Sequence, residues 1–167
     1  TGLRLVALRS VAMHEASVAH PGGMAALLGM EAETAEEVCA TVRHEHKGLV
    51  SVANFNSPGQ VVISGETLAL DLAIRLARMR GAVKVMPLAV AGAWHCDLMK
   101  AAEERLAPAI RAAAMNSPRI PVVANVTAAP VASIDEIRDL LIRQVCGTVR
   151  WCELFQRIET SAAWRRS

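Results

Sequence analysis

The sequence predicts an α/β protein in which a small domain, residues 23–90, is inserted into parts of a larger α/β domain, residues 1–22 and 91–167. Two observations lead to this prediction. Apolar residues in the first part of the chain recur alternately with strand-like and helical spacing, in the order βαββαβ. The later part is mostly helical, and its one or two strands are too few to form a sheet domain of their own.

A helix is expected over residues 3–16, before the small domain, and the Pro-Gly-Gly sequence at residues 21–23 ends it. Its spacing places Ser10 and His14 on one side of the helix. The opposite, apolar face is expected to hold Leu5, Val6, Ala12, Met13 and Ala16.

In the small domain, residues that favour helix starts and ends separate the expected elements. Thr34 and Glu37 have the spacing of a capping box at the start of the first helix, and Gly81 is expected to stop the second. The resulting βαββαβ order is the ferredoxin-like arrangement. Strands are expected at residues 24–30, 49–55, 60–64 and 83–89, and helices at residues 33–44 and 67–80.

The later part of the chain predicts a long helix at residues 97–115, a strand at 120–126 and two further helices at about 134–145 and 149–159. Ser133 and Glu136 form a second capping box. Because this region has so few strands, we expect part of the larger domain's sheet to lie outside the chain. The first residue is Thr1 rather than methionine, which suggests a natural polypeptide that starts earlier.

The composition indicates a packed protein and argues against several partners. The chain is 53% hydrophobic but only 3% aromatic, so aliphatic side chains and alanine must fill the core. Its longest apolar run is far short of the ~20 residues of a membrane helix. A net charge of +2 without a basic run gives no reason to expect nucleic acid or lipid, and no metal site is expected. Reduced thiols and a cytoplasmic location are predicted by four cysteines without disulfide spacing: Cys39, Cys96, Cys146 and Cys152.

His95 is the strongest candidate for a catalytic residue. It follows an apolar strand and a small-residue turn, Ala91-Gly92-Ala93, and it precedes a helix. A histidine at such a junction can be partly exposed and rigidly held, as a catalytic base requires. Amides at a helix N-terminus also disfavour imidazolium, so the ring tends to stay neutral and able to accept a proton. The alternative is a structural histidine.

Two further polar residues interrupt apolar helix faces. Arg9 falls between Leu5 and Ala12, where a guanidinium needs an anion; this is either a structural ion pair or a clamp for a substrate carboxylate. Gln144 falls beside Leu140 and Leu141 on its own helix. It is either a hydrogen-bonded core glutamine or a residue whose free helix-terminal carbonyl receives an outside donor.

Other signals fail. The segment at residues 59–66 resembles a phosphate loop, but its spacing is one residue too long and Glu66 stands where lysine is required. Cys96 lies beside His95, but neighbours at a helix start usually point apart, which favours a small buried thiol. The chain contains no Gly-x-Ser-x-Gly sequence, the usual nucleophile elbow.

Taken together, the motifs resemble the malonyl-CoA:acyl carrier protein transacylases of fatty-acid synthesis over nearly the whole chain. The family's fold is an α/β-hydrolase-like large domain with a ferredoxin-like insert. The matching stretches are the helix around Arg9 with Met13-His14-Glu15-Ala16, Gly23-Met24-Ala25-Ala26-Leu27-Leu28-Gly29, the segment from Ala53 to Gly65, Gly92-Ala93-Trp94-His95, Pro121-Val122-Val123-Ala124-Asn125-Val126, and Arg143-Gln144-Val145 with Val149-Arg150-Trp151.

The resemblance implies a role for each candidate residue. His95 would be the general base that activates a serine, and the main-chain carbonyl of Gln144 would orient its ring. Arg9 would bind the free malonyl carboxylate, and Trp94 would narrow the acyl pocket against an α-methyl group. The implied reaction is ping-pong transfer of malonyl from coenzyme A to the phosphopantetheine thiol of acyl carrier protein, without a bound cofactor, by an enzyme that is monomeric when complete.

The chain departs from the family pattern in two places. The serine elbow and an oxyanion-donating loop precede this segment in the family and are absent here, and the chain ends in Thr160-Ser161-Ala162-Ala163-Trp164-Arg165-Arg166-Ser167 instead of a strand and a Gly-Pro-Gly turn. We therefore expect a transacylase segment that is inactive alone. The alternatives are a polyketide-synthase acyltransferase segment and a non-catalytic module that binds carrier protein or coenzyme A.

Overall fold

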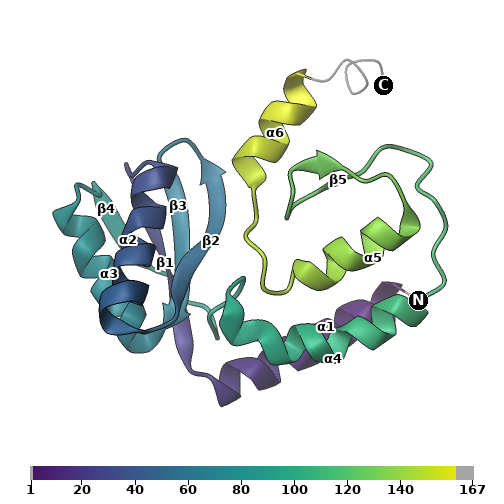
Figure 1. Ribbon diagram of the computed structural model, residues 1–167, viewed down its shortest axis with the longest axis horizontal. Helices are drawn as coiled ribbons and strands as arrows, with labels where there is room; N and C mark the ends of the chain where they lie inside the picture. The colour runs from purple at the N-terminus through teal and green to yellow at the C-terminus, as the bar shows by residue number, and fades with distance from the viewer. Residues whose placement is uncertain (1, 161–167) are drawn as a thin grey trace.

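The computed structural model describes residues 2–160, which form two lobes side by side (Figure 1). The sheet lobe comprises residues 22–87. The helical lobe comprises residues 2–19 and 97–160, so the chain leaves it after the first helix and returns to it after the sheet lobe. The expectation about the chain end at residues 161–167 lies outside the described residues. Within residues 2–160, no helix combines the length and the apolar character that crossing a membrane requires.

The sheet lobe contains a four-stranded antiparallel sheet with the strand order β2-β3-β1-β4. Its elements follow one another in the predicted βαββαβ order. They are β1 (Gly22–Leu28), α2 (Ala32–His46), β2 (Val50–Ser57), β3 (Gln60–Glu66), α3 (Thr67–Met79) and β4 (Lys84–Pro87).

The sheet is buried on both faces, because side chains of a strand alternate between them. Ala25 and Leu27 of β1 face α2 and α3 in the core of the sheet lobe. Met24 and Ala26 point to the opposite face, where partly buried Trp94 packs against them. The continuous apolar run of β1 therefore serves two cores, one inside the sheet lobe and one at the junction with the helical lobe.

The helical lobe is built on α1 (Gly2–Ala19) and α4 (Lys100–Ala112), which pack against each other (Figure 1). A 3-10 turn, η1 (Asp97–Met99), precedes α4. The remaining elements are the short hairpin of β5 (Val123–Ala124) and β6 (Ala129–Pro130), α5 (Ile134–Arg143) and α6 (Trp151–Thr160).

The buried part of α1 differs from the expectation. Ala12, Met13 and Ala16 are buried as predicted, but Val6 is 60% exposed, because burial is confined to the second half of this helix.

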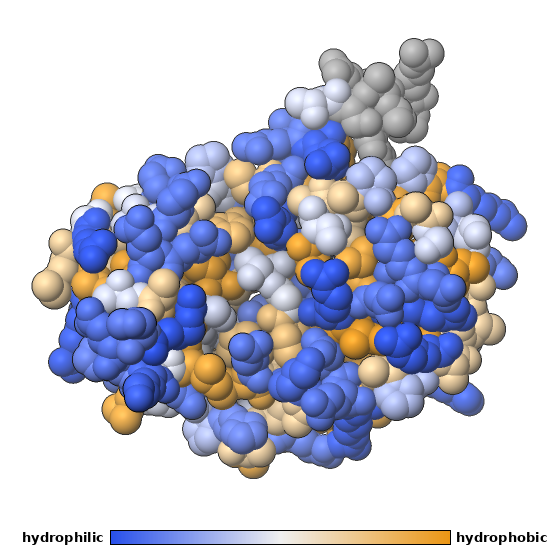
Figure 2. Space-filling model, viewed as in Figure 1, coloured by the Kyte–Doolittle hydropathy of each residue, from blue (hydrophilic) through white to orange (hydrophobic). Residues whose placement is uncertain are grey.

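In the space-filling view, hydrophilic side chains cover much of the visible face of both lobes, and hydrophobic ones show between them (Figure 2).

Several predicted boundaries are wrong for identifiable reasons. Helix α2 starts at Ala32 after Glu31, without a side-chain cap, so Thr34 lies inside the helix and is not its cap. The strand predicted at residues 120–126 shrinks to Val123–Ala124, because only Ala129–Pro130 pairs with it among the described residues. The strand expected at residues 83–89 ends at Pro87.

The N-cap predicted at Ser133 is confirmed, but the second bond of the predicted capping box is shifted by one residue. Ser133 Oγ accepts a hydrogen bond from the Glu136 amide at 3.1 Å, and Glu136 Oε2 accepts one at 2.6 Å from the Ala132 amide, which precedes the cap. The first bond satisfies a donor that a helix start leaves unpaired. The two bonds together hold the start of α5 in place.

The two lobes are joined by main-chain hydrogen bonds at the outer edge of the sheet. The Val149 amide donates to the Ala53 carbonyl at 2.8 Å, and the Phe55 amide donates to the Val149 carbonyl at 2.9 Å. Residues Asn54 and Val149 thus form an isolated parallel bridge. The loop between α5 and α6 is therefore fastened to β2.

The close approach of β2 and β3 at Gly65 gives a stability prediction. A Cβ atom at Gly65 would lie 2.7 Å from Val50 Cα and would also meet the Leu49 carbonyl, and neither backbone atom can move freely. Gly65→Ala is expected to lower the free energy of unfolding by about 1–3 kcal/mol, measured by urea denaturation. Gly23 faces Gly65 across the strand pair, and its Cβ would meet only the flexible end of Leu70. Gly23→Ala is the matched control, and equal losses in both variants would contradict this account.

Candidate active site

His95 lies in the short segment that leads from the sheet lobe into the helical lobe. Its backbone has a φ of 60°, in the left-handed region that residues other than glycine adopt uncommonly. Gly92 fits here because a Cβ would meet Ser17 Cβ of α1 at 2.6 Å. Ala93 is fully buried, and the His95 side chain is half-buried. The segment is held between the two lobes, so the direction of the imidazole ring is fixed by packing on both sides.

The imidazole is oriented by the helical lobe. His95 Nδ1 lies 3.1 Å from the main-chain oxygen of Gln144, at the C-terminal end of α5. A carbonyl oxygen can only accept a hydrogen bond, so Nδ1 is the protonated nitrogen and Nε2 is left as the acceptor. The sequence-predicted free carbonyl at this helix end therefore meets the sequence-predicted histidine.

The surroundings keep this ring neutral. Burial lowers the pKa of His95 from 6.5 and is the largest influence on it. The Gln144 carbonyl raises the pKa, the positive charge of Arg9 lowers it, and the backbone of Gly147 raises it. Because the net direction is downward, His95 is uncharged near neutral pH and can accept a proton.

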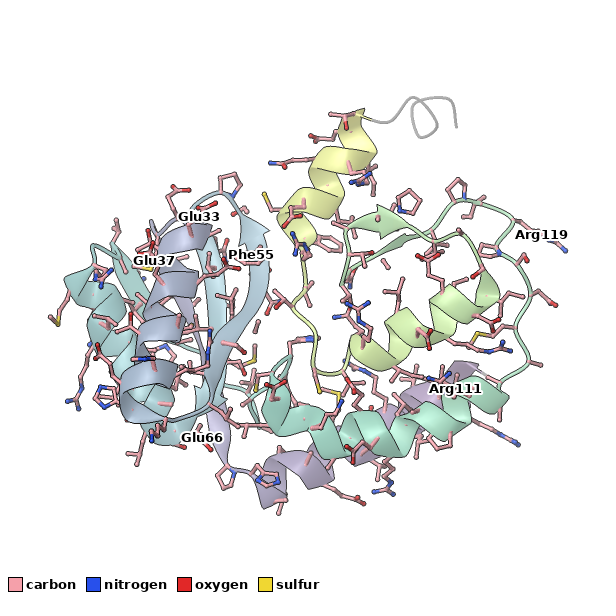
Figure 3. The ribbon with its side chains drawn as sticks, viewed as in Figure 1. Glu33, Glu37, Phe55, Glu66, Arg111 and Arg119 are labelled. Carbon is pink, nitrogen blue, oxygen red and sulfur yellow. The ribbon has the colours of Figure 1, made fainter. Side chains whose placement is uncertain are left out.

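Arg9 is a half-buried cation without an acidic partner among the described residues. Its side chain is half-buried on α1, less buried than the helical spacing suggested. Among residues 2–160, no carboxylate pairs with it, so the structural ion pair that was one alternative is not found there. By contrast, Arg111 of α4 pairs with Asp139 of α5 at 3.2 Å (Figure 3). The guanidinium of Arg9 keeps its donors available while its charge reaches His95.

The side chains of Gln144 and Trp94 have structural contacts of their own. The Gln144 amide Nε2 donates to the Gly147 carbonyl at 3.1 Å, which shapes the loop after α5. Trp94 is half-buried and packs against both the core of the helical lobe and the second face of the sheet. Both residues thus belong to the framework around His95.

Cys96 is a structural thiol. Its sulfur lies 3.2 Å from the Ala93 carbonyl and 3.6 Å from Ser64 Oγ of β3, in a fully buried position. Burial raises its pKa, so the thiolate required of a nucleophile is disfavoured. These contacts agree with the small buried thiol that the sequence favoured.

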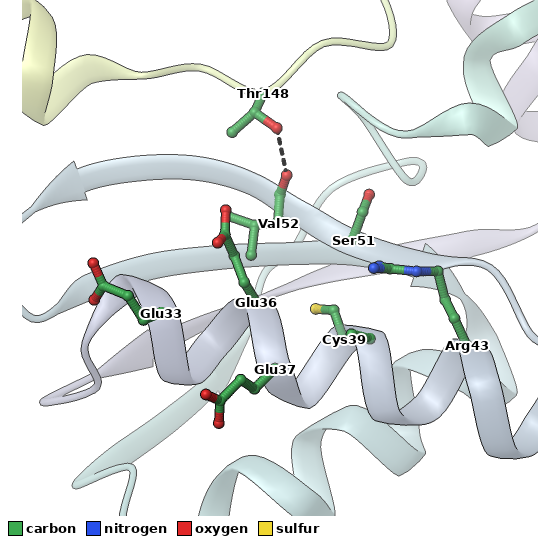
Figure 4. A pocket seen from close by; sticks show the side chains of 9 residues that line it. Glu33, Glu36, Glu37, Cys39, Arg43, Ser51, Val52 and Thr148 are labelled. Carbon is green, nitrogen blue, oxygen red and sulfur yellow. Dashed lines mark hydrogen bonds between the residues drawn. The ribbon is translucent and has the colours of Figure 1, made fainter.

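A cavity of about 550 Å³ lies between α2 and β2, with Thr148 in its lining, and His95 is not among the residues that line it (Figure 4). Glu33 and Glu37 project from α2 at its side (Figures 3 and 4). Cys39, also in its lining, has a pKa raised to about 12 by burial, so this thiol is unreactive. Within residues 2–160, no three histidine, cysteine or acidic side chains gather in a way that could hold a metal ion.

Comparison with known proteins identifies the family. The sequence matches the acyl transferase domain family over residues 1–162. The chain belongs to this family. It is 40% identical over 146 residues to the malonyl CoA-acyl carrier protein transacylase of Bacillus subtilis, a match that covers 87% of this chain and 46% of that protein.

Solved structures of acyltransferases share the fold. An acyl carrier protein S-malonyltransferase from Vibrio cholerae superposes with a TM-score of 0.87 at 40% identity, covering 92% of this chain and 50% of that one. A structure described as a type II PKS acyl-carrier protein in complex with its malonyl-transacylase gives a TM-score of 0.84 at 38% identity, covering 93% and 49%. The chain spans about half the length of the relatives it matches.

Sequence reasoning missed the loop that follows Gln144. The backbone of Gly147 influences His95, and Thr148 fastens the loop to β2 by donating to the Val52 carbonyl at 2.8 Å (Figure 4). Thr148 and Val52 are 96 positions apart in the sequence, and neither helical nor strand spacing predicts such contacts. The signal available was Val149, a β-branched residue in a segment expected to be helical.

The effect of Arg9 on His95 can be measured in this chain. Arg9→Gln removes a positive charge that disfavours imidazolium, so the pKa of His95 should rise, as followed by the NMR titration of its ring protons. Arg4→Gln changes an exposed arginine on the same helix and serves as the matched control. Equal shifts in the two variants, or no shift in either, would refute the electrostatic coupling of Arg9 with His95.

Proposed function

We propose that this chain is the part of a malonyl-CoA:acyl carrier protein transacylase that carries its general base and its carboxylate-binding arginine. The observation that carries the proposal is the hydrogen bond from His95 Nδ1 to the Gln144 carbonyl, which leaves a neutral Nε2 as proton acceptor. The relatives named malonyl CoA-acyl carrier protein transacylase support the choice of reaction and of both substrates.

In the first half-reaction, Nε2 of His95 takes the hydroxyl proton of a serine supplied by the part of the enzyme that this chain does not match. The serine oxygen attacks the malonyl thioester, the carbon–sulfur bond breaks, and the imidazolium returns its proton to the leaving coenzyme A thiolate. In the second half-reaction, the phosphopantetheine thiol of acyl carrier protein gives its proton to His95 and its sulfur attacks the malonyl ester of the serine. The carbon–oxygen bond to the serine breaks, and the imidazolium returns the proton to the serine oxygen. Both half-reactions need only thioester and thiol substrates, without a further cofactor.

The other residues act on the substrate and on the base. Arg9 binds the free malonyl carboxylate through two parallel hydrogen bonds. This carboxylate supplies the anionic partner that the half-buried guanidinium does not have within the described residues. The main chain of Gln144 orients the imidazole, in the way that an aspartate does in other triads. Trp94 narrows the pocket against an α-methyl group, a steric preference of ~1–3 kcal/mol.

The architecture that fits this function has two domains. We assign residues 23–90 to a ferredoxin-like small domain, and its antiparallel β2-β3-β1-β4 order supports the assignment. Residues 1–22 and 91–167 then belong to an α/β-hydrolase-like large domain. The enzyme would be a cytoplasmic monomer, a location consistent with free cysteines throughout the described chain.

A second kind of carrier protein is a candidate acceptor of the malonyl group. One related transacylase is described in complex with a type II PKS acyl-carrier protein, so a polyketide-synthase carrier is an alternative acceptor for the same chemistry. A non-catalytic binding module is the other alternative. Incubation of this chain with labelled malonyl-CoA tests where the nucleophile lies: the proposal expects no covalent label, and label retained on Cys96 or on a serine of this chain would place the nucleophile here, against the proposal.

The role of His95 can be tested in a chimera in which this chain replaces the stretch it matches in the Bacillus subtilis relative. The chimera should transfer malonyl to acyl carrier protein, and His95→Ala should lower the rate of acylation by at least about 10³-fold, because the serine would lose its base. His44→Ala, at an exposed position of α2, is the control. Near-normal acylation by the His95→Ala chimera would end the proposed role.

The role of Arg9 is tested in the same chimera by comparing two acyl groups. Arg9→Ala should slow malonyl transfer by roughly 10- to 100-fold, the worth of hydrogen bonds to a charged group, while acetyl transfer changes little. Arg4→Ala on the same helix should affect neither reaction. Equal losses with malonyl and acetyl would indicate that Arg9 has a structural role.

A further inference from the structure

We infer that Thr148 is a positioning residue for His95. Its hydroxyl attaches the loop at residues 144–149 to the edge of β2, and the Gln144 carbonyl of this loop orients the imidazole. The inference rests on the proposed function only in taking His95 as the base. The Thr148 hydroxyl bonds to the Val52 carbonyl and not to the imidazole, so it acts on His95 through the main chain of the loop at residues 144–149.

The loop itself has a defined internal geometry. The Gly147 amide donates to the Arg143 carbonyl at 2.8 Å, and the Gly147 carbonyl accepts from the Gln144 side chain at 3.1 Å. A Cβ at residue 147 would lie 2.7 Å from the Arg143 oxygen, so the turn requires glycine. These bonds shape the loop, but they all lie within it and leave its placement relative to the sheet lobe undetermined.

Anchoring to the sheet comes from the next two residues. Thr148 Oγ1 donates to the Val52 carbonyl at 2.8 Å (Figure 4). The Val149 amide donates to the adjacent Ala53 carbonyl, also at 2.8 Å. In a regular strand, successive carbonyls point to opposite edges, so two neighbours would not both be available on the outer edge. Here the register of β2 against β3 shifts between Val52 and Asn54. This bulge turns both carbonyls toward the loop.

The same sheet also holds His95. Cys96, the residue after His95, contacts Ser64 Oγ of β3 at 3.6 Å. Ser64 is fully buried, and β3 pairs directly with β2. Both ends of the hydrogen bond between His95 and Gln144 are therefore tied to one pair of strands, through Ser64 on one side and Thr148 on the other.

This common support explains why a hydroxyl is placed at residue 148. The imidazole and its acceptor carbonyl belong to different segments, 49 residues apart, and a bond of 3.1 Å between them requires both segments to keep one separation. Without the Thr148 hydroxyl, the Val52 carbonyl loses its donor and the loop gains freedom to move from β2. The Gln144 carbonyl would then stabilise the imidazolium less well.

The test is an NMR titration of His95 in this chain with Thr148→Val, which replaces the hydroxyl by a methyl group of similar size. Because the carbonyl of Gln144 favours imidazolium, loosening it should lower the pKa of His95 by about 0.5, as expected from the partial loss of one hydrogen bond. Thr148→Ser keeps the hydroxyl and should restore the original value. Arg9 is the charged group that acts on this ring, and it is unchanged in all variants.

Thr41→Val is the matched control, since its hydroxyl donates to the Glu37 carbonyl within α2, at 2.8 Å. The inference is overturned if Thr148→Val moves the pKa no more than Thr41→Val does, or if Thr148→Ser behaves like Thr148→Val. If Thr148→Val fails to fold, Thr148→Ala removes the same hydroxyl without adding a methyl group and should lower the pKa of His95 in the same direction; an unchanged pKa overturns the inference. These titrations are independent of acyl transfer, so failure of His95 as the base would appear only in the chimera.

Discussion

A single hydrogen bond, from His95 Nδ1 to the main-chain oxygen of Gln144, gives this molecule its chemical character. A carbonyl has no proton to give, so it fixes the imidazole as the tautomer with a free Nε2. A carboxylate in the same place would add a negative charge and favour imidazolium more strongly. Burial, with the positive charge of Arg9, outweighs the carbonyl's modest preference for imidazolium and lowers the pKa of His95, so the ring stays uncharged near neutral pH.

The rest of the fold serves to keep that bond at one length. The two lobes meet at Trp94, which packs against the core of the helical lobe and the second face of the sheet, and at the outer edge of β2, where Val149 forms an isolated parallel bridge with Asn54. Arg9 approaches from α1, and its charge lowers the affinity of His95 for a proton. Under the proposed function, a substrate carboxylate bound to Arg9 would neutralise that charge and raise the pKa of His95.

Much of this site could be predicted from local patterns. Period-2 and period-3.6 spacing gave the six elements of the sheet lobe, because each presents an apolar face to a core. Arg9 and Gln144 stood out since each interrupts such a face, and His95 because it follows a small-residue turn. The helix cap at Thr34 failed because the extended backbone that caps α2 belongs to Glu31, a choice made by the preceding turn rather than by side-chain type.

Contacts between distant segments could not be predicted in the same way. The fastening of Thr148 to Val52 depends on a bulge in β2, and the short β5 depends on which strands are present to pair with it. Both features depend on how distant segments are placed in the tertiary structure, which the spacing of residues along the sequence does not predict. The family resemblance located His95 and Gln144 together, whereas their shared support on β2 and β3 emerges only from the coordinates.

The Gln144 carbonyl determines which of the two ring nitrogens of neutral His95 carries the proton, and the NMR signals of these nitrogens report the tautomer directly. A long-range ¹H–¹⁵N correlation spectrum of this chain above the His95 pKa distinguishes the two neutral tautomers. The structure predicts a protonated Nδ1 and an unprotonated Nε2. A ring protonated at Nε2, or an even mixture of both forms, would contradict the account.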